Sequence, residues 1–302
     1  QRKIGISVMM LVKNEEQWIA TCLLSLNSFA DEVIVVDNGS NDNTLGEISR
    51  IKDSLRFSLI MKEDNSNDFR KISNLALSLT SYNWIVRWGG DFIAYTHGKR
   101  NISHLREYLL SLNQKNYYLI YPLLINLYSD LFHVRRNREY HSESYIHSFH
   151  PLLKYVKNRD YDYLKVPWFY KVERILDVYF IHIGYAKPID RIIYRYFWTK
   201  WRSENDFKKY PKIIDYIYEK SQIKWGTVDL KEIAQKVFQE QIPNLKKYDT
   251  HELGEYPDLL KPFLQNPKFR VIYKGNSPYM RSDLIGNEDI KIDGKSILYN
   301  EQ

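Results

Sequence analysis

Four clusters of polar side chains in the first 91 residues have the composition of a site for a nucleotide and its phosphates. Carboxylates and amides accept hydrogen bonds from the imide of a base or from ribose hydroxyls, and basic side chains hold a diphosphate. The clusters are Lys13-Asn14-Glu15-Glu16, Asp37-Asn38-Gly39-Ser40-Asn41-Asp42-Asn43-Thr44, Asn67-Asp68-Phe69-Arg70-Lys71 with Asn74, and Gly89-Gly90-Asp91. Taken singly, each has a structural alternative, because Asp, Asn and Gly favour turns, Asn or Thr can cap a helix, and basic side chains often lie on a solvated helix face.

The clusters adjoin the elements of an alternating pattern of strands and helices. Apolar runs at 6–12, 32–36, 57–61 and 84–88 predict strands, and segments 15–28, 44–51 and 69–79 predict helices. This order is typical of a mainly parallel sheet with right-handed crossovers. Ligands bind at the carboxyl ends of such strands, so we expect the clusters to meet at one edge. The helix that begins near Thr44 is expected to offer backbone donors there.

The pattern changes after residue 91. A helix is predicted at 102–112, strands at 117–127 and 131–136 that could form a hairpin, and a short strand at 152–156. From residue 188 the pattern is amphipathic and helical, especially at 190–201 and 230–239. We therefore expect an α/β domain over 1–187, with a donor side at 1–91 and an acceptor side at 92–187. A mainly helical extension is expected over 188–302.

The composition narrows the class of protein. The chain has 302 residues, 44% of them hydrophobic, and a net charge of +7. That charge suits a polyanionic partner such as a diphosphate or an anionic membrane, but it is scattered and gives little support to nucleic-acid binding. The single cysteine, Cys22, excludes an internal disulfide and a cysteine zinc cluster. With no 18-residue apolar run, a soluble cytoplasmic protein is expected, or one in peripheral contact with the inner face of the membrane.

The segment from Ile6 to Asp91 resembles glycosyltransferase family 2, the inverting group with the GT-A fold. The matching pieces are SVMMLVKNEE, CLLSL, ADEVIVVDNGSNDNT, DFRKISNLAL and YNWIVRWGGD, in order and with agreeing spacing. Beyond residue 91 the resemblance is faint and depends mostly on YFIHIGY. It implies a transfer of a sugar from a nucleotide-sugar donor, expected to be a UDP-sugar, to a glycan, glycolipid or glycoprotein.

The resemblance also implies roles for residues of the donor side. The loop after the first strand and the Asp that ends the second hold the nucleoside in this family, while other positions brace the pocket or contact the diphosphate. The implied nucleotide-sugar-binding residues are Val12, Asn14, Glu15, Asp37, Asn38, Asp42, Arg70, Asn74 and Gly90.

The metal motif of the family is altered here. An Asp-x-Asp motif is expected, and the chain reads Gly89-Gly90-Asp91, so the first carboxylate is missing. The retained Asp91 matches the Asp that binds Mn²⁺ or Mg²⁺ in the family, and His182 could be a second ligand. A lone His between apolar neighbours is also a common core residue. Because these ions keep several water and phosphate oxygens, one carboxylate can suffice.

The expected chemistry is an in-line displacement in which a carboxylate deprotonates the acceptor hydroxyl. Glu173 is the first candidate for this base and Asp177 the second; the alternative places both on a solvated helix. Trp168 or Tyr170 could form an apolar platform for a sugar ring.

Four other interpretations stay open. The altered motif allows a non-catalytic protein that binds a sugar nucleotide or a partner. A nucleotidyltransferase is disfavoured because segment 9–15 has no glycine. His141, His147 and His150 could bind zinc, although no partner motif supports this. Finally, the basic and aromatic run 191–202 could lie on a membrane, but packing across the catalytic domain is favoured.

Overall fold

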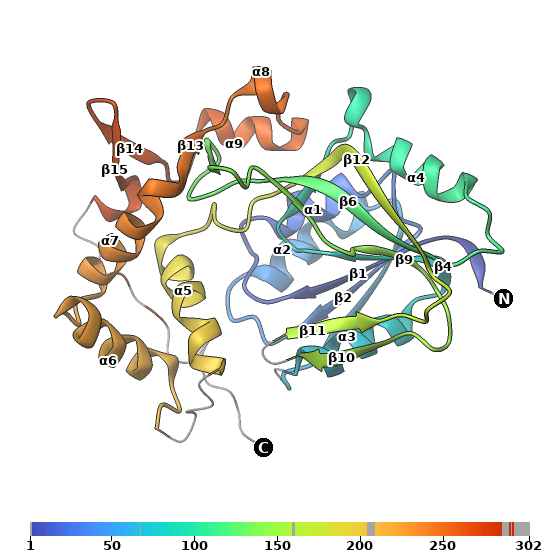
Figure 1. Cartoon of the computed structure of the whole chain (residues 1–302), viewed down its shortest axis with the longest axis horizontal. Coiled ribbons are helices and arrows are strands. Elements are labelled where there is room, and N and C mark those ends of the chain that lie inside the picture. The colour runs from blue at the N-terminus through green and yellow to red at the C-terminus, as the bar shows by residue number, and fades with distance from the viewer. Residues whose placement is uncertain are drawn as a thin grey trace. The chain divides into compact units, whose positions relative to one another are not determined.

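The fold is given by a computed structural model, which describes residues 2–66, 68–158, 161–203, 209–285, 290 and 292. Asn67 of the third polar cluster lies outside these residues. The chain divides into two compact units (Figure 1). Unit 1 comprises 1–125, 140–182 and 254–262, and unit 2 comprises 126–139, 183–253 and 263–302.

Unit 1 begins with the predicted alternation of strands and helices. Its elements up to residue 111 are β1 (Lys3–Val12), α1 (Ile19–Ser25), β2 (Glu32–Asp37), α2 (Thr44–Ile51), β3 (Ser58–Glu63), α3 (Phe69–Leu79), β4 (Tyr82–Trp88), β5 (Phe92–Ala94) and α4 (Ile102–Ser111). The remaining strands are β6 (Tyr118–Asn126), β8 (Tyr140–Ser142), β9 (Ile146–Ser148), β10 (Lys154–Asn158), β11 (Tyr161–Lys165) and β12 (Lys171–His182).

One mixed sheet forms the centre of unit 1, with the strand order β3-β2-β1-β4-β9-β6-β12-β5 and β8 beside β6. Strands β3, β2, β1 and β4 are parallel, while β9 joins β4 antiparallel. Helix α3 lies on one face, and α1 and α4 lie on the other (Figure 1). The α/β class, with a mainly parallel sheet flanked by helices, is therefore confirmed.

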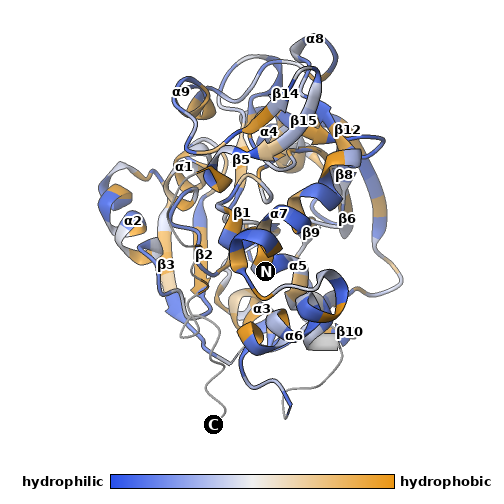
Figure 2. Cartoon of the chain, turned by 90° about the vertical axis from the view of Figure 1, so that its left-hand side faces the viewer, coloured by the Kyte–Doolittle hydropathy of each residue, from blue (hydrophilic) through white to orange (hydrophobic). Residues whose placement is uncertain are grey.

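The parallel strands are apolar along most of their length because both faces are covered. Met9, Ile34 and Ile85 of the strands pack with Ile72 and Ala76 of α3, and all five are fully buried. Figure 2 shows this hydrophobic character along β1 and β2. Burial on both faces explains why continuous apolar runs identified these strands.

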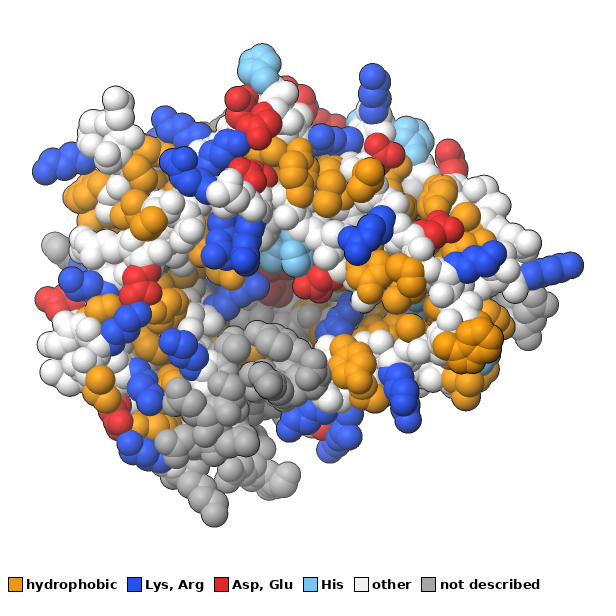
Figure 3. All heavy atoms as spheres, viewed as in Figure 1, with side chains coloured by type: hydrophobic (Ala, Val, Ile, Leu, Met, Phe, Trp, Pro, Cys, Tyr) orange, Lys and Arg blue, Asp and Glu red, His pale blue; other side chains and the backbone are white. Residues whose placement is uncertain are grey.

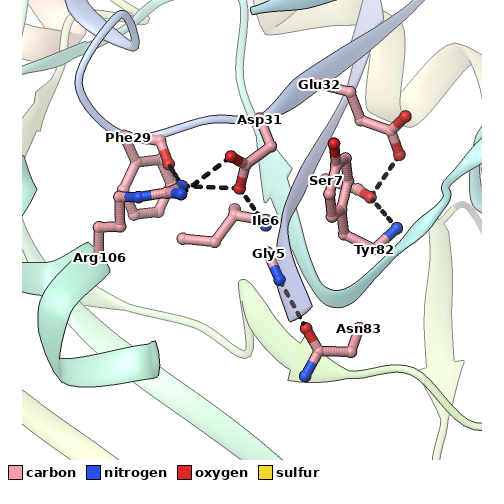
Figure 4. A network of polar contacts seen from close by, with 9 residues as sticks. All are labelled: Gly5, Ile6, Ser7, Phe29, Asp31, Glu32, Tyr82, Asn83 and Arg106. Carbon is pink, nitrogen blue, oxygen red and sulfur yellow. Dashed lines mark hydrogen bonds and ion pairs between the residues drawn. The ribbon is translucent and has the colours of Figure 1, made fainter. Parts of the chain in front are cut away.

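A polar network ties the amino ends of the parallel strands together (Figure 4). Asp31, just before β2, accepts hydrogen bonds from the Ile6 N–H at 2.8 Å and from both terminal guanidinium nitrogens of Arg106 on α4, at 2.7 and 2.9 Å. Beside it, the Ser7 hydroxyl donates to Glu32 at 2.5 Å and accepts from the Tyr82 N–H at 3.0 Å. The network therefore fixes β1, β2 and β4 at the edge where the strands begin.

Two predictions for the middle of the chain need correction. Segments 117–127 and 131–136 do contain strands, β6 and β7 (His133–Arg135), but these two strands form no hairpin. Strand β6 pairs with β8 and β9, and β7 pairs with β13. An isolated bridge between Leu127 and Val134 is a contact between the two segments. Lys171–His182 is the strand β12, so the alternative of a surface helix for Glu173 and Asp177 is wrong. Charged and apolar residues are interspersed along the more exposed first half of this strand.

Unit 2 contains the predicted C-terminal helices together with short strands. Its elements are β7, α5 (Ile189–Ser203), α6 (Ile213–Trp225), α7 (Leu230–Gln241), β13 (Leu245–Lys247), α8 (Thr250–Leu253), β14 (Val271–Lys274) and β15 (Ser277–Arg281), and α9 (Lys261–Gln265) crosses the boundary between the units. Ile193, Phe197 and Trp201 of α5 are buried in the core of this unit. The apolar side of the basic and aromatic run is thus packed in the core of unit 2, while packing across the catalytic domain stays a prediction.

Candidate donor site

The carboxyl ends of β1, β2 and β4 meet at one edge of the sheet. Val12 pairs with Asp37 across β1 and β2, and Met10 pairs with Trp88 across β1 and β4, all in parallel register. The polar clusters that follow these strands therefore lie at the same edge. The predicted convergence of the first, second and fourth clusters is present in the structure.

The loops after β1 and β2 are held together by hydrogen bonds. Asn14 has a left-handed backbone, with φ of 58°, and its N–H donates to the Ser40 hydroxyl at 2.9 Å while its Oδ1 accepts from the Asn41 N–H at 2.9 Å. The Glu15 N–H donates to the Thr44 hydroxyl at 2.7 Å. Asn is among the few residue types that tolerate this backbone conformation. The two loops therefore form one rigid rim.

Asp42 is a brace of this rim. Its carboxylate accepts from the Thr44 N–H at 3.0 Å, from the Thr44 hydroxyl at 2.5 Å and from the Glu16 N–H at 3.2 Å. The Asn43 N–H donates to the Glu16 carboxylate at 2.9 Å. The Asn43 and Thr44 N–H groups are therefore engaged within the protein, and the expectation that this helix end offers donors to a phosphate stays a prediction.

Asp37 and Asn38 end β2 and are both buried, with 3% and 5% of their surface exposed. The Asp37 carboxylate accepts from the Gly39 N–H at 3.1 Å and from the Ser40 N–H and hydroxyl at 2.9 and 2.5 Å. The Asn38 N–H donates to the Val12 carbonyl at 2.8 Å, whereas its buried Oδ1 has no hydrogen-bond partner among the described residues. A buried amide oxygen without a partner is costly, and a donor on a bound ligand would satisfy it.

Gly90 brings the end of β4 against the loop after β1. A Cβ at this position would lie 3.2 Å from Cγ1 of Val12 and 3.1 Å from Cγ of Glu15. Val12, Glu15 and Gly90, all predicted site residues, are therefore in close contact. Glycine permits this close approach of the two loops.

Asp91 and His182 are brought together although they are far apart in sequence. Strand β12 pairs with β5, and its last residue, His182, lies opposite Phe92. The His182 Nε2 lies 3.5 Å from the Asp91 Oδ2, and the two side chains are 15% and 11% exposed. The expected pair of metal-facing side chains is thus adjacent.

The separation of the Asp91 and His182 side chains suits two neighbouring ligands of a divalent cation. Neighbouring ligands of an octahedral Mg²⁺ site are about 3 Å apart, close to the observed separation. Among the described residues there is no group of three or more His, Cys, Asp or Glu side chains that could hold a metal. The pair fits an ion that takes its other ligands from a diphosphate and water, but not a site made by protein alone.

Gly89, which stands where the metal motif of the family has its first carboxylate, is closely surrounded by other side chains. A Cβ at position 89 would lie 2.8 Å from the Asp91 Oδ1 and 2.9 Å from the ring of Phe92. Phe92 in turn packs against His182 with ring centroids 4.9 Å apart. Gly89 therefore belongs to a local arrangement in which a larger side chain does not fit.

Two further groups lie near Asp91, and the sequence pattern did not identify them as site residues. The Cys22 thiol donates to the Gly89 carbonyl, with the two atoms 3.3 Å apart, and burial together with Asp91 raises its pKa. Tyr145 packs against Phe92, and its pKa is raised by burial, by Glu143 and by Asp91. The Tyr145 carbonyl accepts from the Arg87 N–H at 2.8 Å, which places the segment before β9 beside the carboxyl end of β4.

Asn74 and Arg70 lie on α3. The Asn74 side chain accepts from the Tyr155 N–H and donates to the Tyr155 carbonyl, both at 2.9 Å, so it braces strand β10. Arg70 is paired with Asp68 at 3.0 Å, and its side chain is 47% exposed. A bracing role for Asn74 agrees with the prediction, while contact of Arg70 with a diphosphate stays a prediction.

The two candidate bases are not near the other site residues. A strand rises about 3.3 Å per residue, so Glu173 lies about 30 Å and Asp177 about 17 Å along β12 from His182. Glu173 accepts a hydrogen bond from the Tyr108 hydroxyl. Neither carboxylate is brought to Asp91.

The other aromatic and histidine candidates have different surroundings in the structure. Tyr170 is buried and its hydroxyl donates to the Ser148 carbonyl at 2.9 Å, so it offers no platform, whereas Trp168 is 94% exposed. His147 is buried on β9, and burial lowers its pKa to about 3. His141 is bound to Glu143 at 2.8 Å, and His150 packs against Tyr117. These three histidines form no zinc site.

Residues 7–100 match the family model described as glycosyl transferase family 2. A comparison with curated proteins finds no significant match. Among solved structures, TarS of S. aureus in complex with UDP is 22% identical over 41% of this chain and 36% of that chain, with a TM-score of 0.34.

TarS residues 1–349 align over 91% of this chain and 98% of that chain, at 12% identity and a TM-score of 0.43. Glucosyl-3-phosphoglycerate synthase from Mycobacterium tuberculosis is 19% identical over 42% of this chain and 44% of that chain, with a TM-score of 0.27. In the first three TarS comparisons the chain covers only 22% to 36% of the other chain. These structural likenesses are too weak to establish a shared activity. The family match itself, over the segment that carries the donor-side clusters, confirms the resemblance of residues 7–100 to glycosyl transferase family 2.

Proposed function

We propose that this protein transfers a sugar from a nucleotide-sugar donor, a UDP-sugar, to a hydroxyl of a glycan, glycolipid or glycoprotein acceptor, with inversion at the anomeric carbon. The observation that supports this best is the adjacency of Asp91 and His182, at the end of the sheet where the β1 and β2 loops also lie. TarS has been solved with UDP and with UDP-GlcNAc, which suggests the donor class to test first.

The nucleoside is proposed to bind at the ends of β1 and β2. The unpartnered Asn38 Oδ1 can accept from the imide N–H of uracil, and Asp37 can accept from a ribose hydroxyl. Val12 and Asn14 form the adjoining wall, and Asp42 holds the rim without touching the ligand. Arg70 is proposed to approach the diphosphate as an exposed cation.

Asp91 and His182 are the residues that would hold Mn²⁺ or Mg²⁺. When bound, such an ion neutralises the negative charge that builds up on the departing nucleoside diphosphate. Glu15 and Gly90 shape the floor of this part of the site, because Gly90 lies against the Glu15 side chain.

Glu143 is a better candidate for the base than Glu173 or Asp177. Its carbonyl accepts from the Tyr145 N–H at 2.8 Å, the pKa of Tyr145 is raised by both Glu143 and Asp91, and its carboxylate is positioned by the His141 Nε2 at 2.8 Å. Its side chain is 59% exposed, so an acceptor hydroxyl can reach it. The carboxylate would take the proton of that hydroxyl as the oxygen attacks the anomeric carbon and the bond to the diphosphate breaks.

The first test uses Asp91→Asn, which removes the charge and keeps the shape. The assay measures release of UDP from a panel of UDP-sugars, with and without Mn²⁺. The kcat/KM of the variant should fall by roughly 100-fold to 1,000-fold, and the stimulation of UDP release by Mn²⁺ should disappear. Asp53→Asn, an exposed carboxylate after α2, is the matched control and should behave as wild type. If the Asp91 variant transfers sugar normally, the assignment of this residue is wrong.

A second test compares carboxylates that could act as the base. Glu143→Gln should lower the rate of transfer by roughly 100-fold to 10,000-fold while leaving UDP binding, measured by thermal shift, unchanged. Glu173→Gln and Asp177→Asn should retain activity. Loss of transfer in Asp177→Asn with normal Glu143→Gln would reverse the assignment.

A non-catalytic sugar-nucleotide-binding protein is the second candidate. The crowding around Gly89 favours it, because the family carboxylate cannot simply be restored there. Saturable binding of UDP without turnover of any UDP-sugar would support this candidate over the transferase. A cytoplasmic location is a further part of the proposal; among the described residues, no helix is both long and apolar enough to cross a bilayer.

A further inference from the structure

Unit 2 contains a cavity of about 450 Å³ that is separate from the donor-side residues. Its lining residues all belong to unit 2 and include Asp130, His133, Lys247, Arg270 and Tyr273. Segment 126–139 supplies the first two, and the β13 and β14 regions supply the others. The cavity therefore depends on parts of the chain that are remote in sequence.

A buried polar relay forms one wall. Asp130 is fully buried and His133 is 3% exposed. The Asp130 Oδ1 lies 2.7 Å from the His133 Nδ1 and accepts from the Phe132 N–H at 2.8 Å, while Oδ2 accepts from the Val271 N–H at 2.6 Å. Both carboxylate oxygens thus face donors, and Nδ1 is the ring nitrogen of His133 that is placed to donate to this carboxylate.

The relay ends at a hydroxyl that lines the cavity. The His133 Nε2 is hydrogen-bonded to the Tyr273 hydroxyl. In the tautomer that donates from Nδ1 to Asp130, Nε2 accepts the Tyr273 proton, so the phenol oxygen presents lone pairs to a ligand. Burial, with Asp130 nearby, raises the pKa of Tyr273 and keeps it a neutral hydroxyl.

Backbone pairing holds the relay in place. His133 pairs with Lys247 across β7 and β13, and its carbonyl accepts from the Tyr128 N–H at 2.7 Å. Tyr273 lies on β14, which is paired antiparallel with β15. A buried polar array of this kind is not needed for packing, since apolar residues fill a core at lower cost.

The accessible part of the cavity is positively charged. Lys247 and Arg270 are exposed, and the Lys247 Nζ lies 4.6 Å from the centre of the Tyr273 ring. Among the described lining residues, Asp130 is the one acid, and its charge is met by three donors. The local field therefore favours an anion.

We propose that this cavity binds a small phosphorylated polyol: its phosphate on Lys247 and Arg270, and one of its hydroxyls donating to the Tyr273 oxygen. The cations alone would accept any oxyanion. The oriented phenol oxygen adds a requirement for a hydroxyl group on the same molecule. This binding does not depend on the proposed transferase activity.

In the test, the full chain is titrated separately with glycerol 3-phosphate, inorganic phosphate and glycerol, and calorimetry measures the binding of each. Glycerol 3-phosphate should bind at least about 10-fold more tightly than phosphate, and glycerol should not bind measurably. The double variant Lys247→Ala with Arg270→Ala should lower the affinity for glycerol 3-phosphate by roughly 100-fold. Tyr273→Phe should lower the affinity for glycerol 3-phosphate to that for inorganic phosphate. Lys274→Ala, an exposed neighbour that does not line the cavity, is the matched control.

Thermal melting of each variant separates loss of binding from loss of folding. Equal affinity for phosphate and glycerol 3-phosphate would overturn the hydroxyl requirement. Binding that survives the double variant, or no binding of either anion to wild type, would overturn the site.

Discussion

At the scale of single residues, the site combines groups that could be recognised in the sequence with groups that could not. Asp37, Asn38 and Asp91 were identifiable because each directly follows a buried strand, where ligands bind in such sheets. Glu143 and Tyr145 lie between β8 and β9, strands of only three residues each. Such short strands carry no readable periodicity, so nothing in the sequence placed this segment beside β4.

His147 makes the stability of the protein depend on pH. Burial lowers its pKa from 6.5 to about 3, so the unfolded chain takes up a proton in the window between these values while the folded chain does not. Stability is therefore complete above about pH 6.5 and falls as the pH is lowered toward 3. The loss should be about 2 kcal/mol between pH 6.5 and pH 5.

Urea unfolding at these two pH values measures this effect. His147→Leu should remove most of the difference, while His251→Ala, at an exposed position, should keep it. An unchanged pH dependence in His147→Leu would show that other groups cause it.

At the scale of elements, the first four strands and the helices between them were predictable, and the later sheet was not. Helices at 44–51 and 69–79 have the predicted bounds, because their caps and apolar spacing are local features. Strand β12 joins β6 to β5 through pairings between residues far apart in sequence. The contact between His182 and Asp91 depends on that topology, which spacing alone does not give.

Helix α3 and strand β10 are joined by the side chain of Asn74. Asn74→Ala would remove one donor and one acceptor from the Tyr155 backbone, and we expect a loss of about 1–3 kcal/mol in the free energy of unfolding. Ser78→Ala, an exposed change on the same helix, should cost much less. Chemical denaturation of the two variants makes the comparison, and equal losses would refute the bracing role.

At the scale of the whole molecule, charge and division into units matter most. Figure 3 shows Lys and Arg side chains interspersed with Asp and Glu among the described residues of the face drawn. The predicted boundary at residue 187 lies close to the change of unit at 182 and 183. A linear division could not anticipate that 126–139 belongs to unit 2 and 254–262 to unit 1.

A fragment of residues 1–187 should therefore be less stable than the full chain. It lacks the Glu255 carbonyl that accepts from the Tyr95 hydroxyl at 2.8 Å, and it lacks β13, the partner of β7. Limited proteolysis should cut it within 126–139 faster than the full chain. A fragment of residues 1–285 keeps these partners and serves as the control; equal protection of the shorter fragment would contradict the division into units.

The network at the amino ends of the strands has a consequence for how this protein could change its donor. Asp31, Glu32 and Arg106 fasten the sheet at the edge opposite the loops that follow β1, β2 and β4. Because anchoring and recognition occupy opposite ends of the same strands, the recognition loops can vary while the scaffold persists. Selection for a new nucleotide sugar should accordingly enrich substitutions near Asn38 and Gly90 and spare the anchoring carboxylates.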